Sequence, residues 1–295
     1  DIVWYPHGDY ISNSRIRGFM NRYYIVSWQD LLRRSVENIE WFWPAALEYL
    51  GIEWFAPFQR LYDDSEGMPW TKWFIGGKLN ITHNILDRHI RDKKGERTAI
   101  RFETDNGVVQ SVSYNSLFRT VNALAAAMRQ AGIEKGDRVA MCMSISPEAV
   151  AVMLASLKIG AVSVQPSARI APAEIAEYLR EADARLLFIN DGYPRGGKTI
   201  NLRSTFEAVA GISSLRTIVV IERIGTGLTV NRGSVSWENF LSTQSGALIP
   251  TESLDAEHPA LILCSSGTTG KSKAVVHTHG GALAQTVKEI GFAFD

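Results

Sequence analysis

Residues 265–273 combine hydroxyl, glycine and lysine side chains in a way that suits the binding of a polyphosphate. They follow Ala260–Cys264, an apolar stretch typical of a buried strand. Glycines let the backbone bend so that successive N–H groups point into one concavity. Hydroxyl groups donate hydrogen bonds to phosphate oxygens, and lysines add compact positive charge. We therefore predict a phosphate-binding loop, rather than a plain solvated turn, formed by Ser265, Ser266, Gly267, Thr268, Thr269, Gly270, Lys271 and Lys273.

The P-loop of nucleoside triphosphatases is the main competing interpretation of this stretch. That motif needs a glycine five residues before its Gly-Lys pair, and a helix directly after it. The position five residues before Gly270 is Ser265. The residues after Lys273 are Ala-Val-Val-His, which favour a strand. The loop is therefore predicted to join strand to strand, so that no helix N-terminus faces the phosphates.

The segments before the loop alternate between strand and helix patterns. Helices are expected to open at Ser113, Pro147 and Pro172, because these residue types cap or begin helices. Apolar runs between them predict strands, at residues 138–143, 161–165, 185–189 and 217–221. Strands that alternate with helices form parallel sheets with helices on both faces. The fold class is therefore α/β, built from βαβ layers.

The N-terminal quarter differs in composition. It holds seven of the eight tryptophans: Trp4, Trp28, Trp41, Trp43, Trp54, Trp70 and Trp73. We predict a helix that starts at Ser27 and is broken by Pro44, and a second helix over Ala45–Leu50. The large rings are expected to be packing residues that fasten this N-terminal arm onto a neighbouring body. The chain is thus divided into an aromatic-rich helical extension, residues 1–78, and the first part of a larger domain, residues 79–295.

Charge and composition limit the partners and the location. Lys+Arg and Asp+Glu each number 31, so no overall basic field is available for nucleic acid or an anionic membrane. The longest apolar run, Ala149–Leu157, is much shorter than the roughly 20 residues of a spanning helix. The first residues do not resemble a secretion signal, and the two cysteines fit a reducing compartment. We expect a cytoplasmic protein without nucleic-acid or membrane partners; an oligomer is compatible with the sequence.

Histidines provide no convincing metal site. His277 and His279 lie two residues apart on a predicted strand, and would therefore share one face. No third ligand accompanies them, so we predict structural histidines and no metal centre.

The loop is similar to the phosphate loop of the adenylate-forming superfamily, which includes the acyl-CoA synthetases. The pattern there resembles Thr-Ser-Gly-Ser/Thr-Thr-Gly-Lys-Pro-Lys-Gly. This chain departs from it at Ser265, Ser272 and Ala274. The resemblance covers nearly the whole chain. Further stretches are similar to the acetyl/propionyl-CoA synthetase branch: residues 73–80, 84–89, 136–140, 147–149 and 157–161, together with the aromatic N-terminal extension.

The resemblance implies an AMP-forming acid–thiol ligase. In that family a carboxylic acid attacks the α-phosphate of ATP, and the thiol of coenzyme A then attacks the acyl-adenylate, with Mg²⁺ assisting the departure of pyrophosphate. By resemblance, Gly267, Thr268, Thr269, Gly270 and Lys271 hold the β- and γ-phosphates. A short-chain acid such as acetate or propionate is the expected substrate.

Two further segments concern coenzyme A. Residues 191–200 resemble the branch's loop with two basic residues three apart, which implies that Arg195 and Lys198 contact the phosphates of coenzyme A. The branch also has a Phe-Gly-Gly-Phe-Ser-like turn, where this chain has Ser167-Ala-Arg-Ile-Ala171. Arg169 replaces a glycine there, which leaves a ligase for another acid or another acceptor as an alternative.

The resemblance also implies what lies outside these residues. Family members continue with an acyl pocket and a small C-terminal domain that carries a catalytic lysine, so the catalytic residues are expected beyond residue 295. The chain is interpreted as the N-terminal part of the ligase, inactive alone. The alternative is a truncated, non-catalytic module that binds a nucleotide or coenzyme A.

Overall fold

The computed structural model describes residues 7–104, 107–228, 233–242, 244, 246–265 and 273–294, with only the backbone of residues 265 and 273. The chain forms two compact units. Unit 1 comprises Asp1–Leu79, Asp255–Glu257 and His279–Asp295, and unit 2 comprises Asn80–Leu254 and His258–Thr278. The division into domains after residue 78 stays a prediction.

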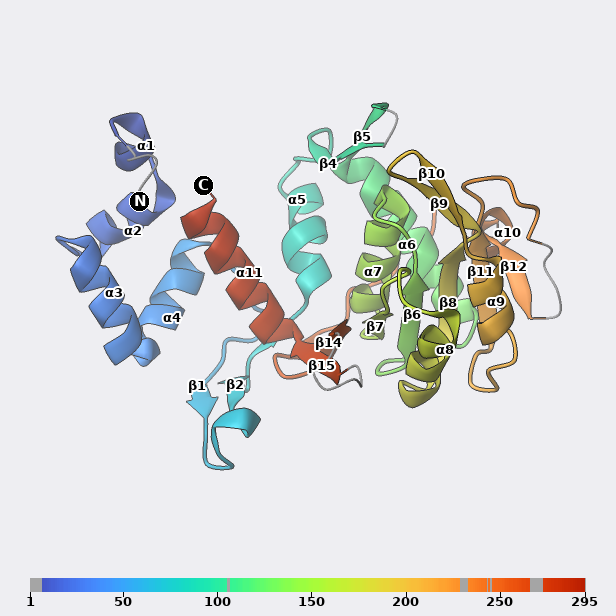
Figure 1. Ribbon diagram of the computed structural model, residues 1–295. Coiled ribbons are helices and arrows are strands. Elements are labelled where there is room, and N and C mark those ends of the chain that lie inside the picture. Colours follow the sequence, from blue (N-terminus) through green and yellow to red (C-terminus); the bar gives the residue numbers. More distant parts are fainter. Residues whose placement is uncertain are drawn as a thin grey trace. The chain divides into compact units, whose positions relative to one another are not determined.

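Unit 2 is built on a seven-stranded sheet with the spatial order β12–β11–β8–β6–β7–β14–β15 (Figure 1). Every neighbouring pair is parallel except β14 with β15, which is antiparallel. The strands are β6 (Arg138–Cys142), β7 (Val162–Gln165), β8 (Ala184–Asn190), β11 (Thr217–Ile221), β12 (Ser234–Ser236), β14 (Pro259–Ser265) and β15 (Lys273–Thr278). The α/β fold class with a mostly parallel sheet is therefore confirmed.

Helices cover both faces of this sheet. The chain moves from β6 to β7 in one direction and then returns past β6 to β8. Because βαβ crossovers are right-handed, this reversal places successive helices on opposite faces. One face carries α6 (Tyr114–Gln130), α7 (Pro147–Lys158) and α10 (Trp237–Leu241), and the other carries α8 (Pro172–Glu181) and α9 (Arg203–Val209) (Figure 1).

Alternating side chains of each strand fill two separate cores. On β6, Val139 packs with α6 and α7, whereas Ala140 packs with α8 and α9. On β8, Phe188 packs with α6 and α7, whereas Leu187 packs with α8 and α9. Burial on both faces explains why these strands read as continuous apolar runs in the sequence.

The helix ends follow from the predicted capping residues. The Ser113 hydroxyl accepts the Ser116 N–H at 3.2 Å, which caps α6. Gly132 follows that helix with a φ of 78°, a left-handed conformation that favours glycine. Pro147 and Pro172 both occupy the first helical position, where no N–H is needed. The helices predicted to open at these residues are confirmed.

Smaller elements complete unit 2. Two antiparallel hairpins project from it, β4–β5 and β9–β10. The bounds are β4 (Thr98–Glu103), β5 (Val109–Ser113), β9 (Gly192–Arg195), β10 (Lys198–Asn201), the π-helical turn His83–Asp87 and α5 (Arg88–Arg91). Of the remaining short strands, β3 (Lys78–Leu79) belongs to unit 1, and β13 (Leu254–Asp255) begins at the last residue of a unit 2 segment.

Unit 1 packs helices around an aromatic core. Its elements are α1 (Asp9–Ser12), α2 (Arg15–Arg22), α3 (Trp28–Glu37), α4 (Ile39–Tyr49), β1 (Arg60–Asp63), the 3₁₀ turn Met68–Trp70, β2 (Lys72–Ile75) and α11 (His279–Ala293). The fully buried Phe19 ring lies 4.8–5.5 Å from the rings of Tyr23, Tyr49 and Phe292. Several rings of the N-terminal quarter thus pack against one another within unit 1, whereas Trp28 and Trp70 are exposed. That the rings fasten this segment onto a neighbouring body stays a prediction.

One helix boundary was predicted wrongly. The first helix ends at Glu37, and α4 runs through Pro44. The break lies at Asn38, whose side-chain carbonyl accepts the Trp41 N–H at 3.1 Å and so starts a new helix. Pro44 removes a single backbone donor from α4, and the packing of Phe42, Ala45 and Ala46 in the unit 1 core retains the helix.

A buried charge network joins three segments of unit 2. The Lys158 ammonium group, which is almost fully buried, donates to the Asp87 carboxylate at 3.0 and 3.1 Å and to the Thr251 hydroxyl at 2.6 Å. The Thr251 hydroxyl also donates to Asp87. Because a buried charge is costly unless it is paired and hydrogen-bonded, the three groups depend on one another.

No helix in the described part of the chain is both long enough and apolar enough to cross a membrane.

We predict that Lys158→Met strongly destabilises the protein, by about 3–5 kcal/mol, because it leaves the Asp87 carboxylate buried without its cation. Urea unfolding followed by circular dichroism measures this change. The matched control is Lys94→Met in the same unit: Lys94 makes a more exposed ion pair with Asp92 at 3.7 Å, and its loss is expected to cost less than about 1 kcal/mol. Equal losses for the two variants would contradict the network.

Candidate functional site

The predicted phosphate loop connects two neighbouring strands. β14 ends at Ser265 and β15 begins at Lys273, and these two residues are paired across the antiparallel ladder. The connection is therefore strand to strand, as the sequence predicts, and no helix follows it directly. This excludes the helix-based phosphate site of a P-loop.

The strand directions place the beginning of this loop at a particular edge of the sheet. β14 runs parallel to β7, with Leu263 opposite Gln165, the last residue of β7. The loop therefore starts at the edge where β6, β7, β8 and β11 also end. In open α/β sheets, ligands bind outside the carboxyl ends of the strands, so the loop begins where such a fold holds its ligands.

The loop residues themselves lie outside the described residues. Of the eight predicted phosphate-binding residues, the structure places only the backbones of Ser265 and Lys273. The other six are Ser266, Gly267, Thr268, Thr269, Gly270 and Lys271, and their roles stay predictions.

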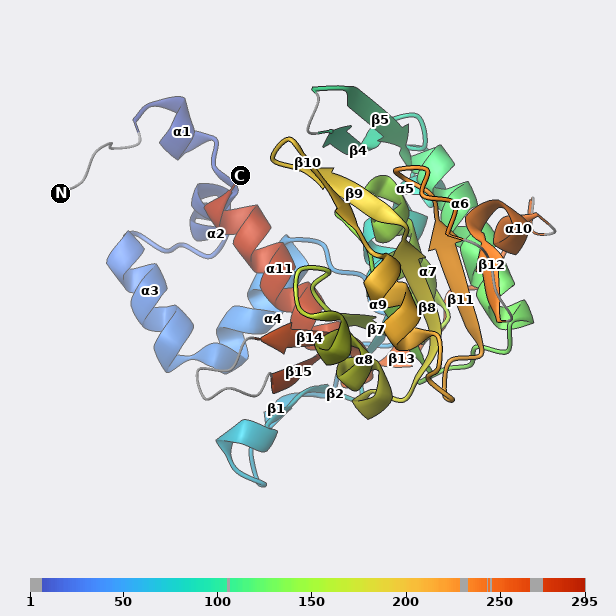
Figure 2. The same ribbon diagram turned by 45° about the vertical axis from the view of Figure 1, so that its right-hand side comes forward.

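The two residues assigned to coenzyme A lie on a hairpin at the same edge. Arg195 ends β9 and Lys198 begins β10, and the two are directly opposite each other. Gly196 and Gly197 form the two-residue turn with φ values of 55° and 74°. Positive φ at both positions is required in this kind of tight turn and is readily adopted by glycine. Figure 2 shows the hairpin extending beyond the end of β8.

The charges on this hairpin face each other without compensation. Both side chains are exposed, and within the described residues neither makes an ion pair. Like charges directly opposite on an antiparallel pair destabilise it. A bound anion would remove this repulsion, because a guanidinium fork and an ammonium group both donate to phosphate oxygens.

Asp191 anchors the base of the hairpin. Its buried carboxylate accepts the N–H groups of Arg223 at 2.6 Å, Ile224 at 3.2 Å and Thr226 at 3.0 Å, and also the Thr226 hydroxyl at 3.1 Å. Burial opposes ionisation of Asp191, but these hydrogen bonds outweigh it and lower the pKa of the carboxyl group. The sequence did not reveal this role, because its partners lie some thirty residues further along the chain.

Gly192, the next residue, is needed for a steric reason. A Cβ atom there would lie 2.4 Å from the Ile200 carbonyl oxygen and 2.2 Å from the Ile224 side chain. At Gly192, where the hairpin begins, the backbone therefore lies closer to the 222–226 segment than a residue with a Cβ atom would allow.

The turn after β7 carries Arg169 at the same edge. Ala168 and Ile170 on either side of it pack partly against the core beneath α8 and α9. The Arg169 side chain is exposed. Compared with the glycine-containing turn of the acetyl/propionyl-CoA synthetase branch, this turn therefore has an additional cation, Arg169. Its apolar neighbours Ala168 and Ile170 still pack against the core.

The two histidines after the loop do not share a strand face. β15 ends at Thr278, and His279 begins α11. The prediction that both lie on one strand was wrong, because the strand is one residue shorter than its alternation suggests. Among the residues that the structure describes, no group of three or more His, Cys, Asp or Glu side chains is arranged to hold a metal ion.

The cysteines are poor candidates for nucleophiles. Both are free, and burial raises the pKa of the Cys142 thiol to about 12. Burial also raises the pKa of Cys264, on the strand that leads to the loop. Since the thiolate is the reactive form, neither side chain suits covalent catalysis near neutral pH.

An apolar cavity within unit 1 is lined by Trp43, Trp73, Phe74, Gly281, Ala284 and Gln285. None of these six residues has a titratable side chain. Without a titratable group this cavity cannot perform acid–base chemistry.

Comparison with known proteins defines the class of the chain. The family model described as AMP-binding enzyme matches residues 86–294, and the model of the acetyl-coenzyme A synthetase N-terminus matches residues 28–85. The chain therefore belongs to the AMP-binding enzyme family. The predicted resemblance to the acyl-CoA synthetases is confirmed.

Individual relatives agree with this. The chain is 34% identical to acetyl-coenzyme A synthetase from Pasteurella multocida, over 94% of this chain and 40% of that protein. It is 35% identical to acetyl-coenzyme A synthetase 2 from Pseudomonas aeruginosa, over 91% of this chain and 42% of that protein. It is 34% identical to 3-hydroxypropionyl-coenzyme A synthetase from Sulfurisphaera tokodaii, over 90% of this chain and 40% of that protein.

A solved structure shows the same fold. Acetoacetyl-CoA synthetase from Streptomyces lividans superimposes with a TM-score of 0.88 at 28% identity, covering 98% of this chain and 45% of that chain. The chain thus spans less than half the length of the relatives it matches.

We predict that Asp191→Asn destabilises the protein by about 2–3 kcal/mol at pH 7, because an uncharged amide turns donor hydrogens toward backbone N–H groups that need an acceptor. Urea unfolding at several pH values measures it. The lowered pKa means that the carboxylate stabilises the fold above the unfolded-state pKa. That contribution is lost as the pH falls through the folded-state value, so the difference between the two proteins should shrink in acid.

Asp137→Asn serves as the control, since Asp137 accepts a single backbone N–H, from Glu134 at 2.9 Å, near the surface. Its cost is expected to stay below about 1 kcal/mol. A wild-type-like stability of Asp191→Asn would contradict the anchoring role.

Proposed function

We propose that the chain is the N-terminal part of an ATP-dependent carboxylic acid–CoA ligase. The observation that carries the proposal is a glycine-, hydroxyl- and lysine-rich connection that starts at the carboxyl edge of the sheet, in a chain of the AMP-binding enzyme family. The complete reaction would convert an acid and ATP to acyl-AMP and pyrophosphate, and then form acyl-CoA and AMP. The names of the relatives favour a short-chain acid such as acetate or propionate.

Each part of this chain would contribute binding rather than bond making. Gly267, Thr268, Thr269 and Gly270 would present N–H and hydroxyl donors to the β- and γ-phosphates, and Lys271 would neutralise their charge. Such donors, fixed before the reaction, stabilise the negative charge that grows on departing pyrophosphate. The acid is activated because a mixed anhydride has a better leaving group than a carboxylate. Ser265, Ser266 and Lys273 would flank this cradle.

We propose that Mg²⁺ binds together with ATP. The described residues offer no cluster of ligands for it, and Mg²⁺ at such sites is commonly held by substrate phosphates and water.

Coenzyme A is the proposed acceptor. Arg195 and Lys198 are directly opposed on a hairpin with a two-residue turn and make no ion pair with another described residue, so they are suited to a phosphate monoester. Arg169 at the same edge makes a different acid or acceptor the alternative within the same reaction class. The proposal involves a small-molecule acid, no nucleic acid and no membrane, and we propose a cytoplasmic location.

A second candidate is a non-catalytic module that binds a nucleotide or coenzyme A. Acid-dependent ATP–pyrophosphate exchange separates the two functions, since only an enzyme exchanges. We propose that these 295 residues alone do not support exchange, because the acyl pocket and the catalytic lysine of the family lie in other segments.

We predict that Lys271→Ala weakens the binding of ATP to the chain by about ten-fold or more, which corresponds to the loss of one charge-assisted contact. Isothermal titration calorimetry measures the affinity. Lys72→Ala is the control, because Lys72 is exposed on β2 in unit 1 and pairs with Glu66. Unchanged ATP affinity in Lys271→Ala would remove the phosphate loop from the proposal.

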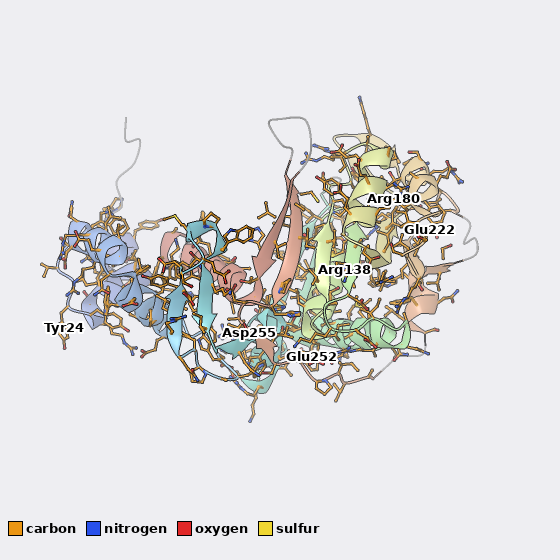
Figure 3. The ribbon with its side chains drawn as sticks, turned by 90° about the horizontal axis from the view of Figure 1, so that it is seen from below. Tyr24, Arg138, Arg180, Glu222, Glu252 and Asp255 are labelled. Atoms are coloured by element: carbon orange, nitrogen blue, oxygen red, sulfur yellow. The ribbon has the colours of Figure 1, made fainter. Side chains whose placement is uncertain are left out.

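We also predict that the chain binds coenzyme A more tightly than dephospho-coenzyme A, which lacks the 3′-phosphate monoester. The double variant Arg195→Ala/Lys198→Ala should lose about 10–100-fold in affinity for coenzyme A and bind both ligands alike. Arg180→Ala is the control, since Arg180 lies in the last turn of α8, away from the carboxyl edge (Figure 3). A preference that survives in the double variant would contradict the assignment.

A further inference from the structure

Three segments that leave neighbouring strands of the unit 2 sheet are bound to one another. β6, β8 and β11 lie side by side in that sheet. At the carboxyl edge they are followed by residues 143–148, by residues 191–201, which contain the basic hairpin, and by residues 222–226. We call these three segments the edge loops. Figure 3 labels Glu222, where the third edge loop begins.

Two adjacent side chains at the base of the hairpin contact the other two edge loops. Asn190, the last residue of β8, is fully buried, and its side-chain carbonyl accepts the Ser144 N–H at 2.9 Å. Asp191 follows it and accepts N–H groups of the 222–226 segment, that of Arg223 at 2.6 Å and that of Thr226 at 3.0 Å. The start of the hairpin is therefore bound to the loop after β6 and to the loop after β11.

An ion pair joins the two outer edge loops directly. The Arg223 guanidinium donates to the Glu148 carboxylate, and Glu148 lies in the first turn of α7. The two side chains are 28% and 31% exposed. With this pair the contacts form a closed ring, because each edge loop is bound to both of the others. Cutting a partly exposed pair is expected to cost little global stability.

The ring controls the part of the hairpin that carries the cations. A Cβ atom on Gly192 would lie 2.2 Å from the Ile224 side chain, so the hairpin base has no free space on that side. Its strands pair from Gly192 with Asn201 up to Arg195 with Lys198. A movement of the base is thus passed along four residue pairs to the two cations. Cations held in place before binding lose less conformational entropy when an anion binds.

We propose that Glu148 and Arg223 are positioning residues for the anion site formed by Arg195 and Lys198. Their ion pair closes the ring of edge loops, holds the hairpin base and so presents the two cations in one geometry. Neither residue contacts the anion. The inference rests on the proposed function, since it concerns the same hairpin, and it adds how that site is held.

Isothermal titration calorimetry of the chain with coenzyme A and with dephospho-coenzyme A tests the proposal. In Glu148→Gln, the affinity for coenzyme A should fall by about 3–10-fold, and that for dephospho-coenzyme A by less than about two-fold, because only the former presents the phosphate monoester to the hairpin. Arg223→Gln should behave alike. The double variant should lose no more than either single variant, since all three remove one interaction.

Glu252→Gln is the matched control. Glu252 pairs with Arg129 in the same unit at 2.8 Å, and the two side chains are 40% and 33% exposed. Arg129 lies in the last turn of α6, before the chain enters the amino end of β6. This pair is similar to that of Glu148 and Arg223 but lies outside the ring. Its loss should leave the affinity for both ligands unchanged.

Hydrogen exchange without ligand tests the ring independently of coenzyme A. In Glu148→Gln, amides of residues 192–201 should exchange faster, while those of the β4–β5 hairpin keep the wild-type rate. Unchanged exchange at residues 192–201 overturns the proposal, as does faster exchange throughout unit 2. Equal losses of affinity for the two ligands also overturn it. A wild-type chain that does not distinguish the two ligands contradicts the coenzyme A assignment instead, and the exchange rates then decide whether the ring holds the hairpin.

Discussion

Both candidate sites depend on one constraint, that parallel strands of a sheet end at a common edge. β8 leads into the basic hairpin and β14 leads into the phosphate loop, and both leave the sheet at the same side. The two hydrophobic cores fix this arrangement, because each strand commits alternate side chains to opposite faces. A slip of β8 by one residue would exchange the environments of Leu187 and Phe188. The packing of the two hydrophobic cores therefore fixes the edge of the sheet at which the candidate sites lie, although the cations of these sites are not part of either core.

The same residue types have opposite roles in this molecule. Lys158 is buried with a carboxylate and a hydroxyl as partners, and it joins segments that are distant in sequence. Arg195 and Lys198 are exposed and directly opposed on a rigid turn. Loss of one partner inside the fold would leave a buried charge uncompensated, whereas the exposed cations at the carboxyl edge are accessible to an anion. Asp191 links the two situations, because its buried carboxylate fixes the base of the hairpin that carries the free cations.

Much of the fold could be predicted from the sequence, because its signals are local. Ser113, Pro147 and Pro172 define helix starts by their own chemistry, and the apolar runs are long enough to indicate buried strands. Two predictions were wrong: tertiary packing keeps α4 helical through Pro44, and β15 ends one residue earlier than its pattern suggests. Asp191 and Gly192 could not be recognised, since their partners are brought near only by the sheet. For the phosphate loop, the residue types indicate the chemistry, and the structure adds the edge from which it begins.

The return of α11 to the first unit has a consequence for synthesis. Phe292 packs against Phe19, so the aromatic core of unit 1 is assembled from segments that lie far apart in the sequence. During translation the early helices leave the ribosome long before their last partner exists. They must remain without it while the intervening sheet is made, and rings such as Tyr49 stay uncovered in that interval. Chaperones that recognise exposed aromatic segments would therefore bind these early helices and release them only after α11 has been made.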